Sequence, residues 1–101
     1  MKSVVYIPWI HGLLTIDAIS LMEKGLIAVK QRLARNIVSR RKALRLSQEQ
    51  LALQAEVDRT YISQIERAVG NPSLLVLHKV AEVLEVDVVA LLMSDGEKGR
   101  G

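Results

Sequence analysis

Residues 46–67, LSQEQLALQAEVDRTYISQIER, contain the start signals of two short helices separated by a tight turn. Ser47 opens the stretch SQEQ, a capping box in which the serine hydroxyl accepts a hydrogen bond from the third helical amide and Gln50 reaches back. The helix that follows this cap is predicted to end near Ala55. After two intervening residues, Asp58 is suited to cap the next helix. The stretch therefore predicts two consecutive short helices.

The apolar residues of both helices recur at helical spacing, so each helix has one inward face. The inward positions are Leu51, Ala52 and Ala55 in the first helix, and Ile62, Ile65, Glu66 and Val69 in the second. Glu66 is therefore an acid on a face that is otherwise apolar. Such a carboxylate needs a cationic partner, because an unpaired buried charge is costly.

A longer helical pattern precedes this stretch and is predicted to form the first core helix, from about residue 27 to residue 44. Its inward positions are Leu26, Leu33, Ile37 and Leu44, with Val29, Ala34 and Val38 beside them. Arg41 falls on the same face, four residues after Ile37. The sequence therefore predicts that Arg41 and Glu66 form a structural ion pair in the core.

Two further helices are predicted after the turn GNP at residues 70–72. The fourth helix begins near Ser73. Its inward positions are Leu74, Leu77, Val80, Ala81 and Leu84. Asp87 is suited to cap a last short helix that runs through Met93 and is apolar on more than one side, which predicts a contact with a partner subunit. The candidate dimer contacts are Val88, Val89 and Leu92.

The composition limits both fold and function. The 101 residues suffice for one domain and are too few for most complete enzymes. Half of the residues are apolar and only 3% are aromatic, which favours packed helices with an aliphatic core. The lack of cysteine excludes disulfides, thiolate metal sites and a cysteine nucleophile. Seven Lys or Arg and no acid lie between residues 28 and 46. Such a run is typical of a protein that binds a polyanion, with a solvated helix face as the alternative.

The chain is predicted to consist of an N-terminal extension (1–25), a helical domain (26–93) and a flexible tail (94–101). The extension is expected to combine a short helix over about residues 15–24 with an apolar arm that covers surface of the same or a neighbouring subunit. The arm residues are Val5, Ile7, Trp9 and Ile10. An alternative is that translation begins at Met22. No segment has the ~20 uninterrupted apolar residues of a membrane span, so a cytoplasmic protein is expected.

Two short helices around a tight turn describe a helix-turn-helix motif, in which the second helix enters the major groove of DNA, about 12 Å wide. Arg59, Thr60 and Gln64 lie on the outward face of this second helix, near its N-terminus. Arginine is suited to guanine N7 and O6, glutamine to adenine, and the threonine methyl to thymine. The alternative for Tyr61 is packing against the preceding helix. The alternative for Ser63 and Gln64 is that they are ordinary surface residues.

Three segments resemble the Xre/Cro/λ-repressor family of DNA-binding domains: LSQEQLA (46–52), YISQIER (61–67) and NPSLLVLHKVAEVL (71–84). The similarity extends from about residue 33 to residue 92. DRTYIS (58–63) is similar in particular to controller proteins of restriction–modification systems. The resemblance implies an all-α, five-helix λ-repressor-like domain that regulates transcription as a homodimer on a palindromic DNA operator.

The resemblance also implies roles for individual residues. Gln48, Arg67 and Asn71 would contact phosphates, and the family has an ion pair at the positions of Arg41 and Glu66. The base-contacting positions would be Arg59, Thr60 and Gln64, with Tyr61 and Ser63 contacting bases or backbone. Arg40 stands where the family usually has an apolar residue. It would either contact a DNA phosphate or lay its stem on the core.

The chain departs from the family in its turns. Where the family often has glycine, this chain has Arg45, Glu56, Ala68 and Glu85. If the backbone there is left-handed, each residue costs roughly 1 kcal/mol or more; otherwise the turns must differ.

No catalytic motif accompanies these features, since the chain lacks a nucleophile elbow, a glycine-rich phosphate loop and paired carboxylates at catalytic spacing. Neither enzymatic activity nor a cofactor is expected. His11 and His78 lack neighbouring ligands in the sequence, so no metal site is expected. A second hypothesis is a protein-interaction module, such as the antitoxin of a toxin–antitoxin pair, whose N-terminal arm binds the partner.

Overall fold

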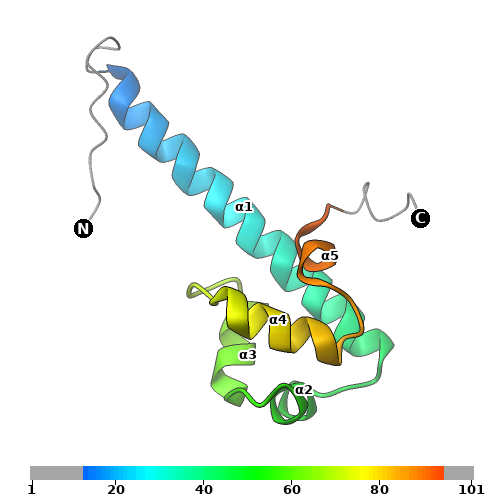
Figure 1. Cartoon of the computed structure of the whole chain (residues 1–101). Coiled ribbons are helices and arrows are strands. Elements are labelled where there is room, and N and C mark those ends of the chain that lie inside the picture. Colours follow the sequence, from blue (N-terminus) through cyan, green and yellow to red (C-terminus); the bar gives the residue numbers. More distant parts are fainter. Residues whose placement is uncertain (1–12, 95–101) are drawn as a thin grey trace.

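The computed structural model describes residues 13–94, and their side chains from residue 20 onward. The helices follow one another as α1 (Leu13–Ala43), α2 (Gln48–Ala55), α3 (Arg59–Glu66), α4 (Leu74–Val83) and α5 (Val88–Leu92). Residues 13–94 contain no strand. The predicted all-α architecture with five helices is confirmed. Figure 1 shows α2 to α5 gathered around the C-terminal half of α1.

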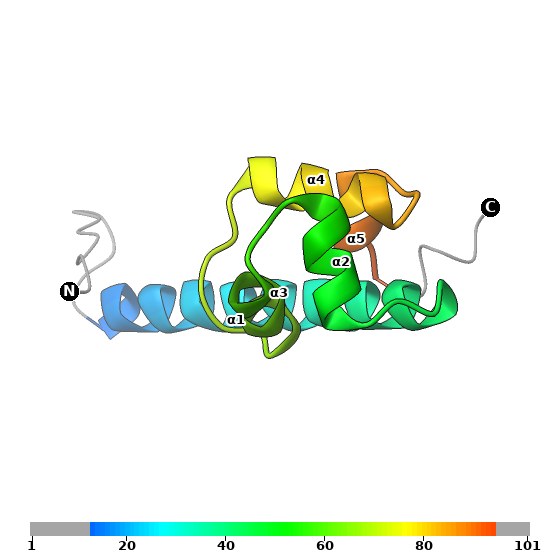
Figure 2. The same ribbon diagram turned by 90° about the horizontal axis from the view of Figure 1, so that it is seen from below.

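The first helix differs from the prediction. A short helix over about residues 15–24 was expected to be separate from the core helix, whereas α1 is one continuous helix of 31 residues. A single glycine costs a helix about 1 kcal/mol relative to alanine, so Gly25 between good helix formers does not interrupt it. The N-terminal half of α1 consequently extends beyond the other four helices (Figures 1 and 2). The expected arm at residues 5–10 lies outside the described residues, and the domain boundary at residue 25 stays a prediction.

The core forms where the C-terminal half of α1 meets the other helices. Its fully buried large side chains are Ile37, Leu51, Ile62, Leu84, Leu91 and Val80. Four expected inward positions are wrong, because Leu26, Val29, Val69 and Leu74 are exposed. Leu26 and Val29 precede the part of α1 that the other helices cover. Val69 follows the end of α3, and Leu74 is the first residue of α4.

The starts of α2 to α5 agree with the sequence signals. The hydroxyl of Ser47 accepts a hydrogen bond from the Gln50 amide, and Gln50 Oε1 accepts one from the Ser47 amide, which completes the capping box. The carboxylates of Asp58 and Asp87 cap α3 and α5. Ser73 caps α4 through its hydroxyl. These local bonds satisfy helical amides that have no partner within the helix.

α5 is attached to α1 by a buried asparagine that the sequence reasoning did not single out. Asn36 Nδ2 donates hydrogen bonds to the carbonyl oxygens of Leu91 (2.7 Å) and Met93 (2.9 Å). Arg32 Nη1 lies 3.4 Å from the Leu92 carbonyl oxygen. These donors satisfy the last carbonyls of α5, which a five-residue helix cannot satisfy internally. An asparagine among apolar positions of a helix was the only available sequence signal.

Candidate nucleic-acid interface

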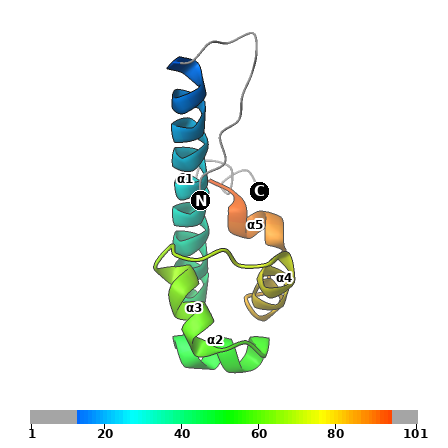
Figure 3. The same cartoon turned by 90° about the vertical axis from the view of Figure 1, so that its left-hand side faces the viewer.

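α3 presents a polar face outward because its apolar face is fixed in the core. Ile62 and Ile65 are buried, whereas Arg59, Thr60 and Gln64 are exposed. Ser63 is half-buried between these two faces. Figure 3 shows α3 on the surface of the domain, beside α1. The structure therefore brings three of the five expected base-contacting side chains together on one exposed helical face.

An ion pair fixes the position of α3 relative to α1. Arg41 Nε lies 2.6 Å from Glu66 Oε2, and Arg41 Nη2 lies 2.9 Å from Glu66 Oε1. The exposed fractions of the two side chains are only 12% and 5%. Arg41 Nη1 also donates to the carbonyl oxygen of Leu46, just before α2. Such a two-bond geometry orients both helices more strictly than a single contact.

Gln48, an expected phosphate contact, belongs to the same network. It is the first residue of α2, and its Nε2 donates a hydrogen bond of 2.9 Å to Glu66 Oε1. The network therefore joins α1, the start of α2 and the end of α3. Because an amide nitrogen has two hydrogens, Gln48 retains one donor beyond this bond. Its phosphate contact stays a prediction.

Tyr61 makes contacts within the domain, which is close to the alternative that its side chain packs against the preceding helix. Its ring is half-buried against the core. Its hydroxyl oxygen accepts a hydrogen bond of 3.1 Å from the amide of Ser73, the residue that caps α4. Tyr61 thus positions the loop between α3 and α4. Its contact with a base stays a prediction.

Arg67 and Asn71 are exposed on that loop. Arg67 ends α3, and its Nε lies 3.4 Å from the Ser63 carbonyl oxygen. Gly70 between them has φ +77°, a conformation that glycine adopts without strain. Both side chains remain accessible to a phosphate next to the outward face of α3.

Arg40 differs from the other expected phosphate contacts in its location. Its Nε donates a hydrogen bond of 2.8 Å to the Leu84 carbonyl oxygen, and its Nη2 lies 3.8 Å from Glu85 Oε1. A cation here is favourable because the C-terminus of α4 carries partial negative charge. Arg40 is therefore held at the end of α4 rather than beside α3, and its phosphate contact stays a prediction.

The four turns in which the resembled family often has glycine adopt a left-handed backbone without glycine. Arg45, Glu56, Ala68 and Glu85 have φ values of 58°, 57°, 61° and 62°. All four are therefore in the left-handed region. Two outcomes were expected for these turns: a left-handed backbone at a cost for each residue, or a different turn. The left-handed backbone is the one observed.

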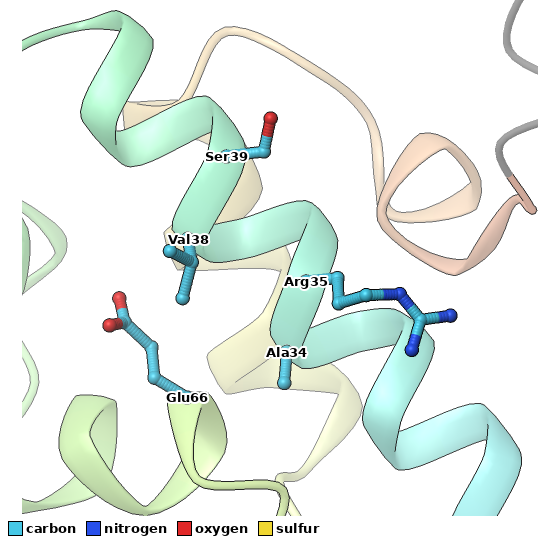
Figure 4. Close-up of a pocket in the computed structure, with 5 residues that line it drawn as sticks. All are labelled: Ala34, Arg35, Val38, Ser39 and Glu66. Carbon is cyan, nitrogen blue, oxygen red and sulfur yellow. The ribbon is translucent and has the colours of Figure 1, made fainter.

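A shallow hollow lies between α1 and α3 and contains no catalytic constellation. It is lined by Ala34, Arg35, Val38, Ser39 and Glu66. Figure 4 shows Val38 and Glu66 reaching toward the same space while Arg35 points away. Among the side chains that the structure describes, from residue 20 to residue 94, no three His, Asp or Glu residues are grouped as metal ligands. None of the described helices combines the length and the apolar composition that a membrane span requires. His78 Nε2 lies 2.9 Å from Glu82 Oε1 on the exposed side of α4.

Comparison with protein-family models matches residues 37–91 to the family described as "Helix-turn-helix". That segment runs from the buried part of α1 to α5 and includes the whole exposed α3 face. The chain belongs to the helix-turn-helix family. It therefore belongs to a group of DNA-binding transcriptional regulators and repressors.

Three relatives illustrate this membership of the helix-turn-helix family. The control protein C.SmaI of Serratia marcescens is 41% identical over 70 residues, which cover 69% of this chain and 83% of that protein. The restriction–modification controller protein C.AhdI of Aeromonas hydrophila is 33% identical, with a TM-score of 0.61 over 63% of this chain and 97% of that one. The solved complex of SinR protein and SinI protein contains a chain that is 39% identical, with a TM-score of 0.61 and 65% coverage of each chain. The predicted similarity to Xre-like repressors and controller proteins is confirmed.

Proposed function

We propose that the chain regulates transcription by binding a palindromic operator as a homodimer. The observation that carries this proposal is the exposed polar face of α3, whose opposite face is fixed by Ile62, Ile65 and the Arg41–Glu66 pair. A helix held in this way is suited to enter the major groove without reorganising. Its position therefore contributes to recognition at little conformational cost.

Base contacts and phosphate contacts have different tasks in this proposal. Arg59, Thr60 and Gln64 select the sequence, and Ser63 and Tyr61 add contacts at the edge of the same face. The proposed phosphate contacts are Gln48, Arg67, Asn71 and Arg40. They supply affinity that falls as the salt concentration rises. The cause is that the release of counterions from DNA is less favourable in more concentrated salt.

Dimerisation places two α3 helices in successive major grooves, about 34 Å apart. On α5, Val89 is exposed, whereas Val88 and Leu92 are half-buried against the core. Val89 is therefore the α5 residue best placed to contact a second copy, with Val88 and Leu92 beside it.

Selection of bound duplexes from a random DNA pool tests the proposal most directly. A regulator of this kind should enrich a palindrome whose half-sites are about 10 base pairs apart. Enrichment of a single, non-repeated site would contradict the homodimer, and the absence of any enriched sequence would contradict specific DNA binding.

Replacing Arg59 by alanine should weaken binding to the selected operator by about 1 to 3 kcal/mol and relax discrimination at one base pair. The reason is that a bidentate arginine contact depends on the base that it reads. Fluorescence anisotropy on operator variants measures both effects. The matched control is Arg67→Ala, which should weaken all duplexes equally and reduce the salt slope by about one. If Arg59→Ala weakened binding to all duplexes equally, Arg59 would contact a phosphate and not a base.

A protein partner is the second candidate function, favoured by the relative solved in complex with SinI protein. The proposed docking element is the N-terminal arm, which lies outside the described residues. Removing residues 1–12, which precede α1, should abolish a complex purified from the native host and leave operator affinity within about twofold, because α3 is unchanged. A complex that persists without residues 1–12 would rule out the arm as its binding element.

A further inference from the structure

The loop between α3 and α4 joins the outward face of α3 to two proposed phosphate contacts. It comprises residues 67–73, and we call it the α3–α4 loop. Arg67 and Asn71 lie on it, and Figure 3 shows it running from the end of α3 to the start of α4. A Cβ atom on Gly70 would lie 3.8 Å from Gln64 Oε1, so the loop backbone lies beside a proposed base contact. The position of the loop therefore decides how the proposed phosphate and base contacts are spaced.

Backbone hydrogen bonds fix the first end of the α3–α4 loop. The amides of residues 67–69 donate hydrogen bonds of 3.0 Å to carbonyl oxygens of α3, those of Ser63, Ile65 and Gln64. These bonds close the C-terminus of α3 and depend on no side chain. The first three residues of the loop consequently move with α3.

A single side chain fixes the second end of the loop. The Tyr61 hydroxyl oxygen accepts a hydrogen bond of 3.1 Å from the amide of Ser73. Ser73 in turn caps α4, because its own hydroxyl accepts a hydrogen bond from the amide of Val76. Residues 70–72 lie between the two ends, and Asn71 is the middle one. The bond to Tyr61 is therefore the restraint that follows Asn71 along the chain.

The core directs the ring of Tyr61 toward the loop and away from the outward face of α3. Tyr61 and Ile65 are four residues apart, so they share a side of the helix, and Ile65 is buried. The ring is half-buried against the core. Thr60 and Gln64 form the neighbouring exposed line. A tyrosine with a packed ring and a bonded hydroxyl is restrained at both ends, so its oxygen is held at the loop and out of that line.

We propose that the Tyr61 hydroxyl is a positioning group, which holds the α3–α4 loop in the conformation in which Asn71 meets a DNA phosphate. The hydroxyl then sets the affinity for DNA of any sequence and does not choose a base. This inference rests on the proposed function for the phosphate contact of Asn71. It leaves the ring of Tyr61 available at the edge of the outward face.

The physical reason is that an ordered loop loses less conformational entropy when it meets DNA. Without the hydroxyl, the exposed amide of Ser73 takes water as its partner, and residues 70–72 sample more conformations. The apparent dissociation constant then rises in proportion as the binding-competent loop becomes less populated. The complex is weakened although no group that touches DNA has been removed.

Tyr61→Phe tests the effect because it removes the hydroxyl and keeps the ring. It should raise the dissociation constant of the selected operator about three- to tenfold, the effect of one neutral hydrogen bond. An unrelated duplex should lose affinity by the same factor, because a phosphate contact carries no sequence information. Fluorescence anisotropy measures both constants, at a temperature where circular dichroism shows that both proteins are folded. A loss confined to one base pair of the operator would identify the hydroxyl as a base contact and overturn the inference.

A double-mutant cycle shows whether the hydroxyl acts through Asn71. Asn71→Ala removes the proposed phosphate contact, so adding Tyr61→Phe to it should change the affinity by less than about twofold. Arg59 gives the matched control, because it lies on the opposite side of α3 from Tyr61. The factors for Tyr61→Phe and Arg59→Ala should multiply. If the factors for Tyr61→Phe and Asn71→Ala also multiply, the hydroxyl contacts DNA by itself and the inference is overturned.

Nuclear magnetic resonance tests the loop without DNA. In Tyr61→Phe the amide of Ser73 should exchange with solvent faster, and the amide of Asn71 should have a lower order parameter. The amide of Val69 is the internal control, because its bond to the Gln64 carbonyl oxygen remains. An unchanged order parameter at Asn71 would overturn the inference.

The inference and the proposed function fail in different experiments. If the wild-type chain selects no DNA sequence, the proposed function fails, while nuclear magnetic resonance still decides whether Tyr61 orders the loop. If the chain selects a palindrome and Tyr61→Phe binds it as tightly as the wild type, the function stands and the inference is overturned.

Discussion

Replacing Glu66 by alanine should lower the free energy of unfolding by about 3 to 5 kcal/mol. The substitution leaves the Arg41 guanidinium, whose side chain is only 12% exposed, without its carboxylate partner. It also removes the acceptor of the Gln48 amide. A charge that stays buried without a partner loses its hydration and gains nothing in return, so this cost exceeds that of a lost surface pair. Urea denaturation followed by circular dichroism measures the loss.

Two further substitutions test how much of this loss comes from the missing hydrogen-bond acceptor and how much from removing any acid. Glu66→Gln keeps a carbonyl oxygen as an acceptor, so it should cost less than Glu66→Ala. Glu49→Ala removes an exposed acid from the first turn of α2 and should cost at most about 1 kcal/mol. If Glu66→Ala unfolds at the wild-type urea concentration, the pair does not stabilise the fold.

The consequence of losing Glu66 extends to DNA binding. Glu66 accepts hydrogen bonds from α1 and from the start of α2, and it lies at the end of α3. A small shift of α3 displaces its outward side chains together. Where Glu66→Ala remains folded at low temperature, it should therefore weaken operator binding although Glu66 does not face the DNA.

Replacing Arg45, Glu56, Ala68 and Glu85 together by glycine should raise the free energy of unfolding by about 2 to 4 kcal/mol. Each residue has φ near +60°, which costs about 1 to 2 kcal/mol for a residue with a side chain. Glycine removes this cost but adds about 0.4 to 1 kcal/mol of entropy to the unfolded chain. At each site, the backbone strain that glycine removes exceeds the entropy cost that it adds. The gains at the four sites are expected to add, because the sites follow four different helices.

The turns themselves should survive this change. In all four, the residue after the left-handed one donates its amide to a carbonyl five residues earlier, at 3.0 Å. This bond closes the helix end without using a side chain, so glycine preserves it. Thermal denaturation of the fourfold variant and of each single variant measures the gain.

A glycine inside a helix provides the matched control. Gln54 is exposed within α2, two residues before Glu56. Gln54→Gly should lower stability by about 1 kcal/mol, because a helical backbone gains nothing from glycine. If Glu56→Gly and Gln54→Gly both destabilise the domain, the left-handed residues are not strained.

Some side chains could not be placed from the sequence because their partners depend on how helices meet. Arg40 and Arg41 are neighbours in the chain, yet Arg41 binds Glu66 whereas Arg40 binds the Leu84 carbonyl oxygen. A one-residue step turns the side chain by 100° around the helix, so the two arginines meet different elements. The chemistry of an arginine alone predicts neither partner.

The sequence by itself determined the starts of α2 to α5, most of the buried positions, the two inward charges and the outward face of α3. These features depend on hydrogen bonds and on spacing within a few residues, which the order of amino acids specifies directly. The tertiary structure alone decided that α1 continues through Gly25, that Asn36 holds α5, and that Tyr61 positions the loop before α4. It also decided that Leu26 and Val29 stay exposed. The physical reason is that burial and long-range hydrogen bonds depend on which surfaces meet in space, and that is fixed only when the helices pack.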